Sequence, residues 1–332
     1  MIFSRQRRVT YYCCLASISI LVVLHVVCDI NLTSVLIGHD KCYPEVNGGR
    51  HFDRGFLVAE PGTCFEEEEG ATVHPRPVFL LVLIASAVGN FERRQAIRET
   101  WGSPKQIMGK TVVTVFLLGE DDVASGSFSP ETRDLLQSEG ATHHDVIQAD
   151  FLDTYNNLTV KTIIGMKWIH MYCPHASYFM KTDDDMYINY ANIIKTLTSP
   201  LTPTKAFAMG HLFPKSLVIR IIFFKFYMPR CMYPEMFYPP YFAGSGYVMS
   251  GDLAGKIYKT ASKVNFLYFE DVFVGVCLKA LGVKPVGHEG FYYTHVDYEF
   301  CKYRNDVITS HGVETKEVYN IWQDIHHSNT VC

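Results

Sequence analysis

The sequence lacks most of the patterns that assign a chain to a common ligand class. No Cys-x-x-Cys pair occurs among its 10 cysteines, which argues against a zinc site. There is no Walker or Rossmann glycine fingerprint, because the short glycine-rich stretch 244–246 has neither the spacing nor the strand-to-helix context. Neither sign of charge is in large excess, and the net charge of −4 gives no electrostatic reason to bind nucleic acid. No internal repeat is evident, so a repeat array is excluded.

One long apolar run is present, near the N-terminus. Residues 9–28 are long enough to span a bilayer core, and Arg5, Arg7 and Arg8 before them favour a cytoplasmic N-terminus. A cleaved signal peptide is the alternative, but the run is long for one and no small-x-small cleavage site closes it. The sequence therefore predicts a cytoplasmic tail at 1–8 and an uncleaved signal anchor at 9–28.

The rest of the chain is then expected in a lumen or outside the cell. Asn31 and Asn157 each begin an N-glycosylation sequon. Seven cysteines lie outside the anchor, an odd number, so at least one is free or pairs with another chain. Residues 29–77 are irregular and contain a run of glutamates, which indicates a stem. Residues 78–332 are enough for one large α/β catalytic domain.

Strand and helix signals alternate after this stem. Residues 78–84 and 111–118 have the apolar pattern of buried strands, and 91–101 and 157–172 have helical spacing. A further strand leads into residues 183–185. This βαβα order predicts a mostly parallel central sheet covered on both faces, with ligands bound beyond the carboxyl ends of its strands.

Three consecutive aspartates follow that strand. In an extended segment Asp183 and Asp185 point the same way while Asp184 faces elsewhere. Clustered carboxylates repel one another, and a divalent cation such as Mg²⁺ or Mn²⁺ relieves that repulsion. A solvated acidic loop is the alternative, but the apolar flanks favour a metal site.

A second acidic pair, Glu270 and Asp271, lies among aromatic and aliphatic residues. Two carboxylates in such surroundings are costly to bury without a partner or a task. Helix capping would explain Glu270, because a helix is expected over 272–281. A general base is the other interpretation, since desolvation raises a carboxyl pKa. His288, His295 and His311 lie downstream, and His311, at a strand end, is best placed to complete a metal site.

Arginines and glycines supply further candidates for a phosphate-bearing ligand. Arg93, Arg94 and Arg98 have guanidinium groups suited to phosphate, and Arg94 and Arg98, four residues apart, share a helix face, although a solvated basic face is the alternative. Gly244 and Gly246 indicate either a turn that lets the backbone approach a ligand or a plain structural turn.

Six segments together resemble one family, the β-1,3-glycosyltransferases of glycosyltransferase family 31. They follow in the family's order and spacing over roughly residues 78–332, which is specific, whereas a lone Asp-x-Asp would be weak. The segments are 93–102 (RRQAIRETWG), 116–119 (FLLG), 150–162 (DFLDTYNNLTVKT), 181–185 (KTDDD), 238–248 (YPPYFAGSGYV) and 270–275 (EDVFVG).

The resemblance implies a GT-A type fold that binds a nucleotide sugar, with Mn²⁺ at the donor diphosphate. Asp183 and Asp185 match the family's Asp-x-Asp metal ligands, and His311 is similar to its C-terminal ligand histidine. Asp271 matches the general base, which deprotonates an acceptor hydroxyl in an inverting single displacement. The expected donor-binding residues are Arg94, Arg98, Asp183, Asp184, Asp185, Gly244 and Gly246.

Among the family's members the chain is most similar to the β-1,3-galactosyltransferases. That implies UDP-galactose as donor and the 3-hydroxyl of a terminal N-acetylhexosamine or galactose on a glycoprotein or glycolipid as acceptor. Asp184 resembles the N-acetylglucosaminyl members instead, so UDP-N-acetylglucosamine is an alternative donor. Residues 216–224 are apolar where the family is polar and basic, so a catalytically impaired lumenal sugar- or metal-binding protein is a further alternative. With the anchor, the resemblance implies a single-pass type II protein of the Golgi membrane.

Overall fold

The computed structural model describes residues 52–67, 73–121, 130–328 and 330–332. The predicted tail and anchor lie outside these residues, and within them no helix is both long and apolar enough to cross a bilayer. The described chain divides into two units. One contains residues 217–237, and the other contains the remaining described residues.

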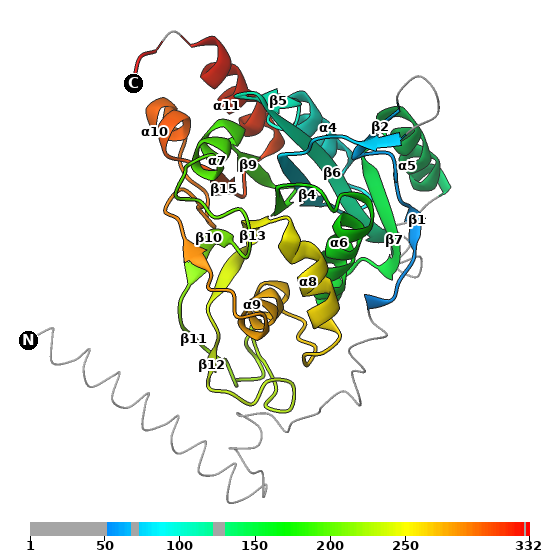
Figure 1. The fold of residues 1–332 in the computed structure, drawn as a ribbon, viewed down its shortest axis with the longest axis vertical. Coiled ribbons are helices and arrows are strands. Elements are labelled where there is room, and N and C mark those ends of the chain that lie inside the picture. The colour runs from blue at the N-terminus through cyan, green and yellow to red at the C-terminus, as the bar shows by residue number, and fades with distance from the viewer. Residues whose placement is uncertain (1–51, 68–72, 122–129, 329) are drawn as a thin grey trace, which may run out of the picture. The chain divides into compact units, whose positions relative to one another are not determined.

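The larger unit is built on a mixed sheet of nine strands, in the order β1-β7-β6-β4-β8-β13-β10-β14 with β5 paired to β6 (Figure 1). Their bounds are β1 (Phe56–Val58), β4 (Leu80–Ala85), β5 (Gln106–Ile107), β6 (Lys110–Glu120), β7 (Val146–Leu152), β8 (Tyr178–Asp183), β10 (Ala208–Phe213), β13 (Tyr241–Ser250) and β14 (Val286–Gly287). β7, β6, β4 and β8 run parallel, as the alternating pattern predicts. β13 runs antiparallel to both β8 and β10, which makes the whole sheet mixed, not mostly parallel.

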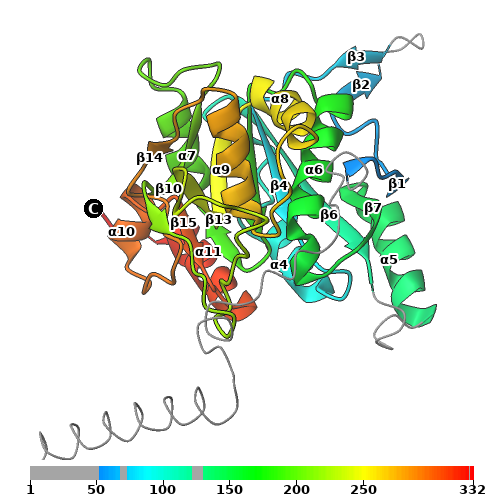
Figure 2. The ribbon, with the colours of Figure 1, turned by 90° about the horizontal axis from the view of Figure 1, so that it is seen from below.

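Helices cover both faces of this sheet, as Figure 2 shows. α6 (Leu158–Tyr172), α8 (Asp252–Ala261) and α9 (Glu270–Ala280) pack on one face. α4 (Phe91–Glu99), α7 (Tyr190–Leu197) and α11 (Thr315–His327) pack on the other. α5 (Pro130–His143) lies beside β7, and α10 (Phe300–Asn305) precedes the last strand. The helix predicted at 157–172 is therefore confirmed, whereas α9 begins two residues earlier than expected.

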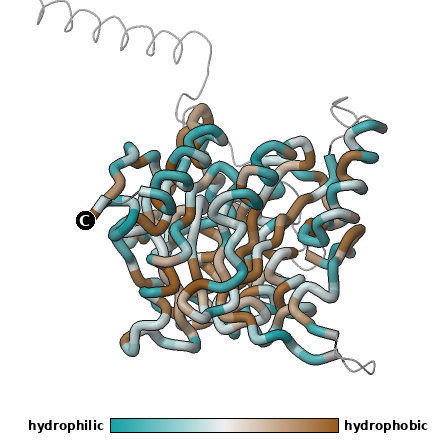
Figure 3. The backbone as a smooth tube through the Cα atoms, turned by 90° about the horizontal axis from the view of Figure 1, so that it is seen from above, coloured by the Kyte–Doolittle hydropathy of each residue, from teal (hydrophilic) through white to brown (hydrophobic). Residues whose placement is uncertain are grey.

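Strand β4 explains why the centre of the sheet is apolar on both faces. Leu80, Val82 and Ile84 are buried in a core cluster with side chains of α4, α7 and α11. Leu83 points the opposite way, toward α6. Such a strand has a continuous apolar sequence because both of its faces are covered. The backbone coloured by hydropathy shows hydrophobic stretches through the interior and hydrophilic ones along the outer turns (Figure 3).

Residues before the boundary predicted at residue 77 take part in the central sheet. β1, which falls in the predicted stem, pairs antiparallel with β7 and adds an edge strand to the sheet. Phe52 is fully buried, and Cys64 forms a disulfide with Cys173 after α6. β2 (Phe65–Glu67) and β3 (Val73–Pro75) pair as a separate hairpin. The described part of the predicted stem is thus tied to the central sheet by a strand and a covalent bond.

The described cysteines include a free one, as the odd number of cysteines outside the predicted anchor indicates. Cys301 pairs with Cys332, and Cys277 is free and buried. Burial raises the pKa of the Cys277 thiol to about 12, so it stays protonated and unreactive. In the Asn157 sequon, Thr159 is buried and its hydroxyl donates to the carbonyl of Leu267 at 2.7 Å.

Candidate active site

The three aspartates lie at the carboxyl end of β8, the central strand where the parallel and antiparallel halves of the sheet meet. Asp183 ends the strand, and Asp184 and Asp185 form the turn into β9 (Met186–Ile188). β9 pairs with β15 (Thr309–His311), which brings His311 opposite Met186. The three carboxylates contact three different sets of side chains.

Asp183 is bound to a buried lysine. The Nζ of Lys181 donates to Asp183 Oδ1 and to the Gly244 carbonyl, both at 2.6 Å, and lies 3.8 Å from Glu270 Oε2. Burial acts to lower the pKa of Lys181, but the charges of Asp183 and Glu270 raise it further, so the ammonium stays charged. Lys181 therefore joins the aspartate triplet to the second acidic pair in one site.

Asp184 faces away from Asp183, as strand alternation predicts. Its Oδ2 accepts hydrogen bonds from Ser86 at 2.7 Å and from Asn90 at 2.8 Å, and its Oδ1 accepts one from Arg93 at 3.3 Å. All three donors lie between β4 and the first turn of α4. The Asp184 carboxylate thus fastens this connection to the end of β8.

Asp185 and His311 form the pair that best fits a metal ion. His311 Nε2 lies 3.4 Å from Asp185 Oδ2, while its Nδ1 lies 3.1 Å from the Tyr293 carbonyl. A carbonyl only accepts, so Nδ1 carries the proton and leaves the Nε2 lone pair of the neutral ring available. Asp185 Oδ1 is buried without a hydrogen-bond partner. A buried oxygen without a partner beside an imidazole nitrogen suits Mn²⁺.

The protonation of this pair follows from its contacts. Burial acts to raise the pKa of Asp185, but the contact with His311 outweighs it and the pKa is lowered. The same contact raises the pKa of His311. In the described residues no three His, Cys, Asp or Glu side chains are already grouped as metal ligands. Asp183 would have to turn from Lys181 to join Asp185 and His311.

Glu270 and Asp271 occupy the first turn of α9. Glu270 is buried in that turn, where an acid complements the helix dipole as predicted, and its side chain accepts a hydrogen bond from the Tyr247 hydroxyl at 2.7 Å. Asp271 Oδ1 accepts one from the backbone of Val272 at 2.7 Å. Burial, and next the charge of Glu270, raise the pKa of Asp271 to about 7. A carboxylate that accepts a proton near neutral pH is suited to general-base catalysis.

Gly244 and Gly246 lie inside β13, not in the turn that their sequence indicates. A Cβ at Gly244 would lie 2.9 Å from Glu270 Oε2, so the absence of a side chain lets the strand approach the acidic pair. At Gly246 the nearest atoms would be 3.5 Å away, an ordinary contact, and the residue pairs with Thr182. The close backbone approach is therefore specific to Gly244.

Of the three arginines predicted as phosphate ligands, the two that share a helix face are engaged elsewhere. Arg94 is fully buried and binds both carboxylate oxygens of Glu139, at 2.9 and 2.7 Å. Arg98 binds both oxygens of Asp145 at 2.8 Å and also contacts Glu139. Their guanidinium groups hold α4 to α5 and β7, which is a structural role. Arg93 is the arginine that faces the aspartates, at 3.3 Å from Asp184 and 3.8 Å from Asp185.

Lys181 is a central residue of the site that was not among the predicted site residues. It lies two residues before Asp183, so strand alternation puts both on one face, and that signal was present in the sequence. The contacts of Ser86 and Asn90 with Asp184 span more than ninety residues and have no local signal. His295 is not part of the site, because it pairs with Glu317 at 3.0 Å. His288 accepts a hydrogen bond from the Gly290 backbone instead.

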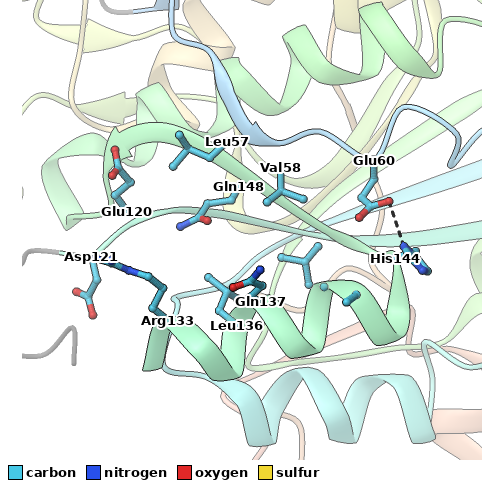
Figure 4. Close-up of a pocket in the computed structure, with 13 residues that line it drawn as sticks. Leu57, Val58, Glu60, Glu120, Asp121, Arg133, Leu136, Gln137, His144 and Gln148 are labelled. Atoms are coloured by element: carbon cyan, nitrogen blue, oxygen red, sulfur yellow. Dashed lines mark ion pairs between the residues drawn. The ribbon is translucent and has the colours of Figure 1, made fainter. Parts of the chain in front are cut away.

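A cavity of about 590 Å³ lies apart from these residues, between α5, β1 and β7. Figure 4 shows Glu120 and Asp121 at one end and the ion pair of Glu60 with His144, 3.6 Å apart, at the other. None of the predicted site residues lines it. The acidic site is therefore separate from this cavity.

Comparison with known proteins gives concordant matches. A family model described as Galactosyltransferase matches residues 92–289. Beta-1,3-galactosyltransferase 1 of Mus musculus and of Homo sapiens is 39% identical over 271 residues, which covers 81% of this chain and 78% of that protein. Beta-1,3-galactosyltransferase 2 of Mus musculus is 38% identical over 302 residues, which covers 89% and 68%.

Solved glycosyltransferase structures are similar only at a distance. The WbbM bifunctional glycosyltransferase matches with a TM-score of 0.41 and 12% identity, over 76% of this chain and 50% of that one. Galactosyltransferase LgtC in complex with donor and acceptor sugar analogs matches with a TM-score of 0.38 and 9% identity, over 76% and 97%. At these scores the two structures add nothing to the sequence relatives.

Proposed function

The chain belongs to the galactosyltransferase family and is a hexosyltransferase of the β-1,3-galactosyltransferase type, and we propose that it transfers galactose from UDP-galactose with Asp271 as general base. The acceptor is the 3-hydroxyl of a terminal N-acetylhexosamine or galactose on a glycoprotein or glycolipid. The fold that carries this reaction is of the GT-A type. The observation that supports the proposal best is the raised pKa of Asp271, about 7, in a site that Lys181 joins to the aspartates.

The reaction is a single displacement. Asp271 takes the proton of the acceptor hydroxyl as its oxygen attacks the anomeric carbon of the sugar. The new carbon–oxygen bond forms on the face opposite UDP, and the bond to the diphosphate breaks with its electron pair leaving on UDP. An α-linked donor then gives a β-linked product. Only one carboxylate is needed on the acceptor side, unlike the two of glycoside hydrolysis.

The donor diphosphate is expected at the end of β8. Asp183, Asp185 and His311 would hold Mn²⁺, whose charge stabilises the departing diphosphate. The unpartnered Asp185 Oδ1 and the available Nε2 of His311 support this set. Arg93, 43% exposed and directed at the same aspartates, supplies a guanidinium for the phosphates.

Lys181 balances the negative charge of the two half-sites while Asp183 is not bound to a metal ion. Its ammonium lies between Asp183 and Glu270, 2.6 Å and 3.8 Å from their carboxylate oxygens. Glu270, hydrogen-bonded to Tyr247 and buried, raises the pKa of its neighbour Asp271 by its charge. Glu270 is thus a positioning residue and Asp271 is the proton acceptor.

UDP-N-acetylglucosamine is the second candidate donor, because Asp184 resembles the residue at this position in the N-acetylglucosaminyl members of the family. The Asp184 carboxylate is fully engaged by Ser86, Asn90 and Arg93. These contacts explain the acid at position 184, because it anchors the connection between β4 and α4. No role in the choice of donor is needed to explain it. The similarity to galactosyltransferases then favours galactose.

We further propose that the enzyme acts in the Golgi lumen, anchored by residues 9–28. The disulfides Cys64–Cys173 and Cys301–Cys332 support an oxidising compartment. The anchor itself lies outside the described residues.

The test is a panel of UDP-sugars assayed with Mn²⁺ against terminal acceptor sugars. The proposal expects UDP-galactose to be used best and a chelator to abolish transfer. Equal or better use of UDP-N-acetylglucosamine would replace the donor assignment. Full activity after chelation would remove the metal role of Asp183, Asp185 and His311. UDP-sugar binding without any transfer or hydrolysis would indicate a relative that has lost turnover.

A further inference from the structure

Four aromatic side chains lie together at the ends of β10 and β13. Phe213, the last residue of β10, is the cross-strand partner of Tyr241, the first residue of β13, and their ring centres are 5.2 Å apart. Phe213 also contacts the rings of His211 at 5.1 Å and Tyr293 at 5.4 Å. The rings of His211 and Tyr293 are 4.3 Å apart. We call this set the aromatic row: Tyr241, Phe213, Tyr293 and His211.

The row lies on the sheet face that carries Asp271. Side chains of cross-strand partners project to the same face, so Phe213 and Tyr241 share one. A Cβ at Gly275 of α9 would lie 2.6 Å from the Cβ of Tyr241, and α9 packs along β13 on this face (Figure 2). Gly275 follows Asp271 by one helical turn. Burial raises the pKa of Tyr241, and the charge of Asp271 adds to this, which is consistent with a ring near the carboxylate.

The other end of the row adjoins the histidine of the metal site. The carbonyl of Tyr293 accepts the Nδ1 hydrogen of His311 at 3.1 Å. Tyr293 is 42% exposed, and Phe213 and His211 are partly exposed, so solvent reaches the rings. The row therefore extends between the proposed base and a proposed metal ligand, and it presents accessible aromatic surface there.

The order of the strands indicates which substrate meets this surface. The parallel strands β4, β6 and β7 lie on one side of β8, and the antiparallel strand β13 and its neighbour β10 lie on the other. Ligands of parallel sheets bind beyond the carboxyl ends of the strands, so we expect the nucleotide on the side of β4. His211 and Phe213 lie on β10 and Tyr241 on β13, beside the base that receives the acceptor proton.

We propose that the aromatic row binds the acceptor sugar by stacking, with Phe213 and Tyr293 as determinants of acceptor affinity. This inference rests on the proposed function, which assigns the acceptor to Asp271. A pyranose carries C–H groups on its faces and hydroxyls around its rim, and the C–H groups pack on the electron-rich face of an aromatic ring. Stacking therefore orients the sugar without engaging its hydroxyls, and the 3-hydroxyl is left to reach the base.

The direct test is a binding titration that needs no turnover. The probes are the methyl β-glycosides of galactose, N-acetylglucosamine and N-acetylgalactosamine, each titrated into the full-length protein with UDP and Mn²⁺. Saturation-transfer NMR reads the Kd and the sugar protons that contact the protein. The proposal expects the strongest transfer to the C–H protons of one face of the sugar. Even transfer around the ring, or no binding of any glycoside by the wild type, overturns it.

Variants at Tyr293 separate stacking from other roles of the side chain, and all of them keep the backbone contact with His311. Tyr293→Leu stays apolar but loses the ring, and it should raise the Kd of the best glycoside about tenfold. Tyr293→Phe keeps the ring and should stay within about twofold of the wild type. The matched control is Tyr258→Leu, at a partly exposed tyrosine on α8 beside Lys167, which should not change the Kd. An unchanged Kd in Tyr293→Leu, or an equal rise in the control, contradicts the proposal.

Phe213→Leu tests the row at a second position, with thermal unfolding to show that the variant is folded. The glycoside Kd should again rise about tenfold, while the Kd of UDP stays the same. The uracil ring of the donor is the alternative occupant, because nucleobases also stack on aromatic side chains. A rise in the Kd of UDP with no change for the glycoside would assign the row to uracil and overturn the proposal. A wrong donor sugar or a wrong base would leave these titrations unchanged, so this proposal and the proposed reaction fail separately.

Discussion

At the scale of single residues, the site depends on how each charge is neutralised. Asp183, Glu270 and Asp271 are all pushed toward their protonated forms by burial, and Lys181 opposes this in each case. Asp271 is the least directly paired of the three, since within the described part of the chain no cationic group bonds to it. It is therefore the carboxylate most able to exchange a proton with a substrate.

The pH dependence of the reaction tests this assignment. Because ionised Asp271 is the proton acceptor, kcat/KM should rise with pH through about 7 and then level off. Asp297→Asn, at an exposed aspartate outside the site, should leave that profile unchanged. A profile that levels off below pH 5 would contradict a base with a raised pKa.

Stability should depend on pH in the opposite direction. The folded pKa of Asp271 lies above its unfolded value, so its contribution is present at low pH and is lost as pH rises through about 7. Asp271→Asn removes this loss, and its Tm at pH 8 should exceed that of the wild type by roughly 5 °C. The two proteins should converge below pH 4. Thermal unfolding at both pH values measures this, and a lower Tm for the variant at pH 8 would contradict it.

The arginines offer a sharper comparison, because neighbours on one helix have different roles. Arg93→Ala should raise the KM for the donor about tenfold with little change in Tm, since Arg93 is exposed toward the aspartates. Arg98→Ala should lower stability by about 3 kcal/mol, because it leaves Asp145 partly buried without its arginine and removes one of the two arginines that bind Glu139. A raised donor KM in Arg98→Ala, together with a loss of stability in Arg93→Ala, would instead assign phosphate binding to Arg98.

At the scale of elements, the approach of α6 to the sheet depends on one glycine. A Cβ at Gly165 would lie 2.4 Å from Leu83 and 2.8 Å from Leu117. Gly165→Ala should therefore cost about 1–2 kcal/mol, even though alanine favours helices.

The matched control is Gly140→Ala, in the last turn of α5, where a Cβ meets nothing within 4 Å. This change should stabilise by about 0.5–1 kcal/mol, because helix propensity alone acts. Chemical denaturation measures both. If the two variants shift stability in the same direction, α6 is not closely packed on β4 and β6.

Local sequence patterns predicted the elements better than their partners. The apolar runs of β4 and β6 and the helical spacing of α6 were sufficient to place them. The antiparallel entry of β13 had no local signal, because strand direction is set by long-range pairing. The partners of Arg94 and Arg98, 45 and 47 residues further along the chain, could not be inferred from helix spacing either.

At the scale of the whole molecule, the N-terminal edge is held covalently. The Cys64–Cys173 disulfide links residues 109 apart, whereas Cys301–Cys332 links residues 31 apart. Cross-links that close longer loops restrict the unfolded chain more. Replacing Cys64 and Cys173 by serine should lower stability by about 2–5 kcal/mol, and replacing Cys301 and Cys332 by about 1 kcal/mol less. Equal losses in thermal unfolding would show that loop length does not decide the effect.

The start of the α/β domain could not be predicted from local sequence. Residues 52–67 are irregular in composition, which indicated a stem, yet β1 pairs with β7 and Cys64 is cross-linked. Both features depend on residues far along the chain. The aspartate triplet, by contrast, lies at the strand end where the sequence placed it, since that position follows from the βαβ pattern alone.

Galactose transfer by the purified full-length wild type and by Asp271→Asn, with the product linkage read by NMR, tests the central claim most directly. The wild type should make a β-linked product at the acceptor 3-hydroxyl. Asp271→Asn should be slower by about 10³-fold while still binding UDP-galactose, because only the proton acceptor is lost. An α-linked product, or full activity in Asp271→Asn, would contradict an inverting transfer with this residue as its base.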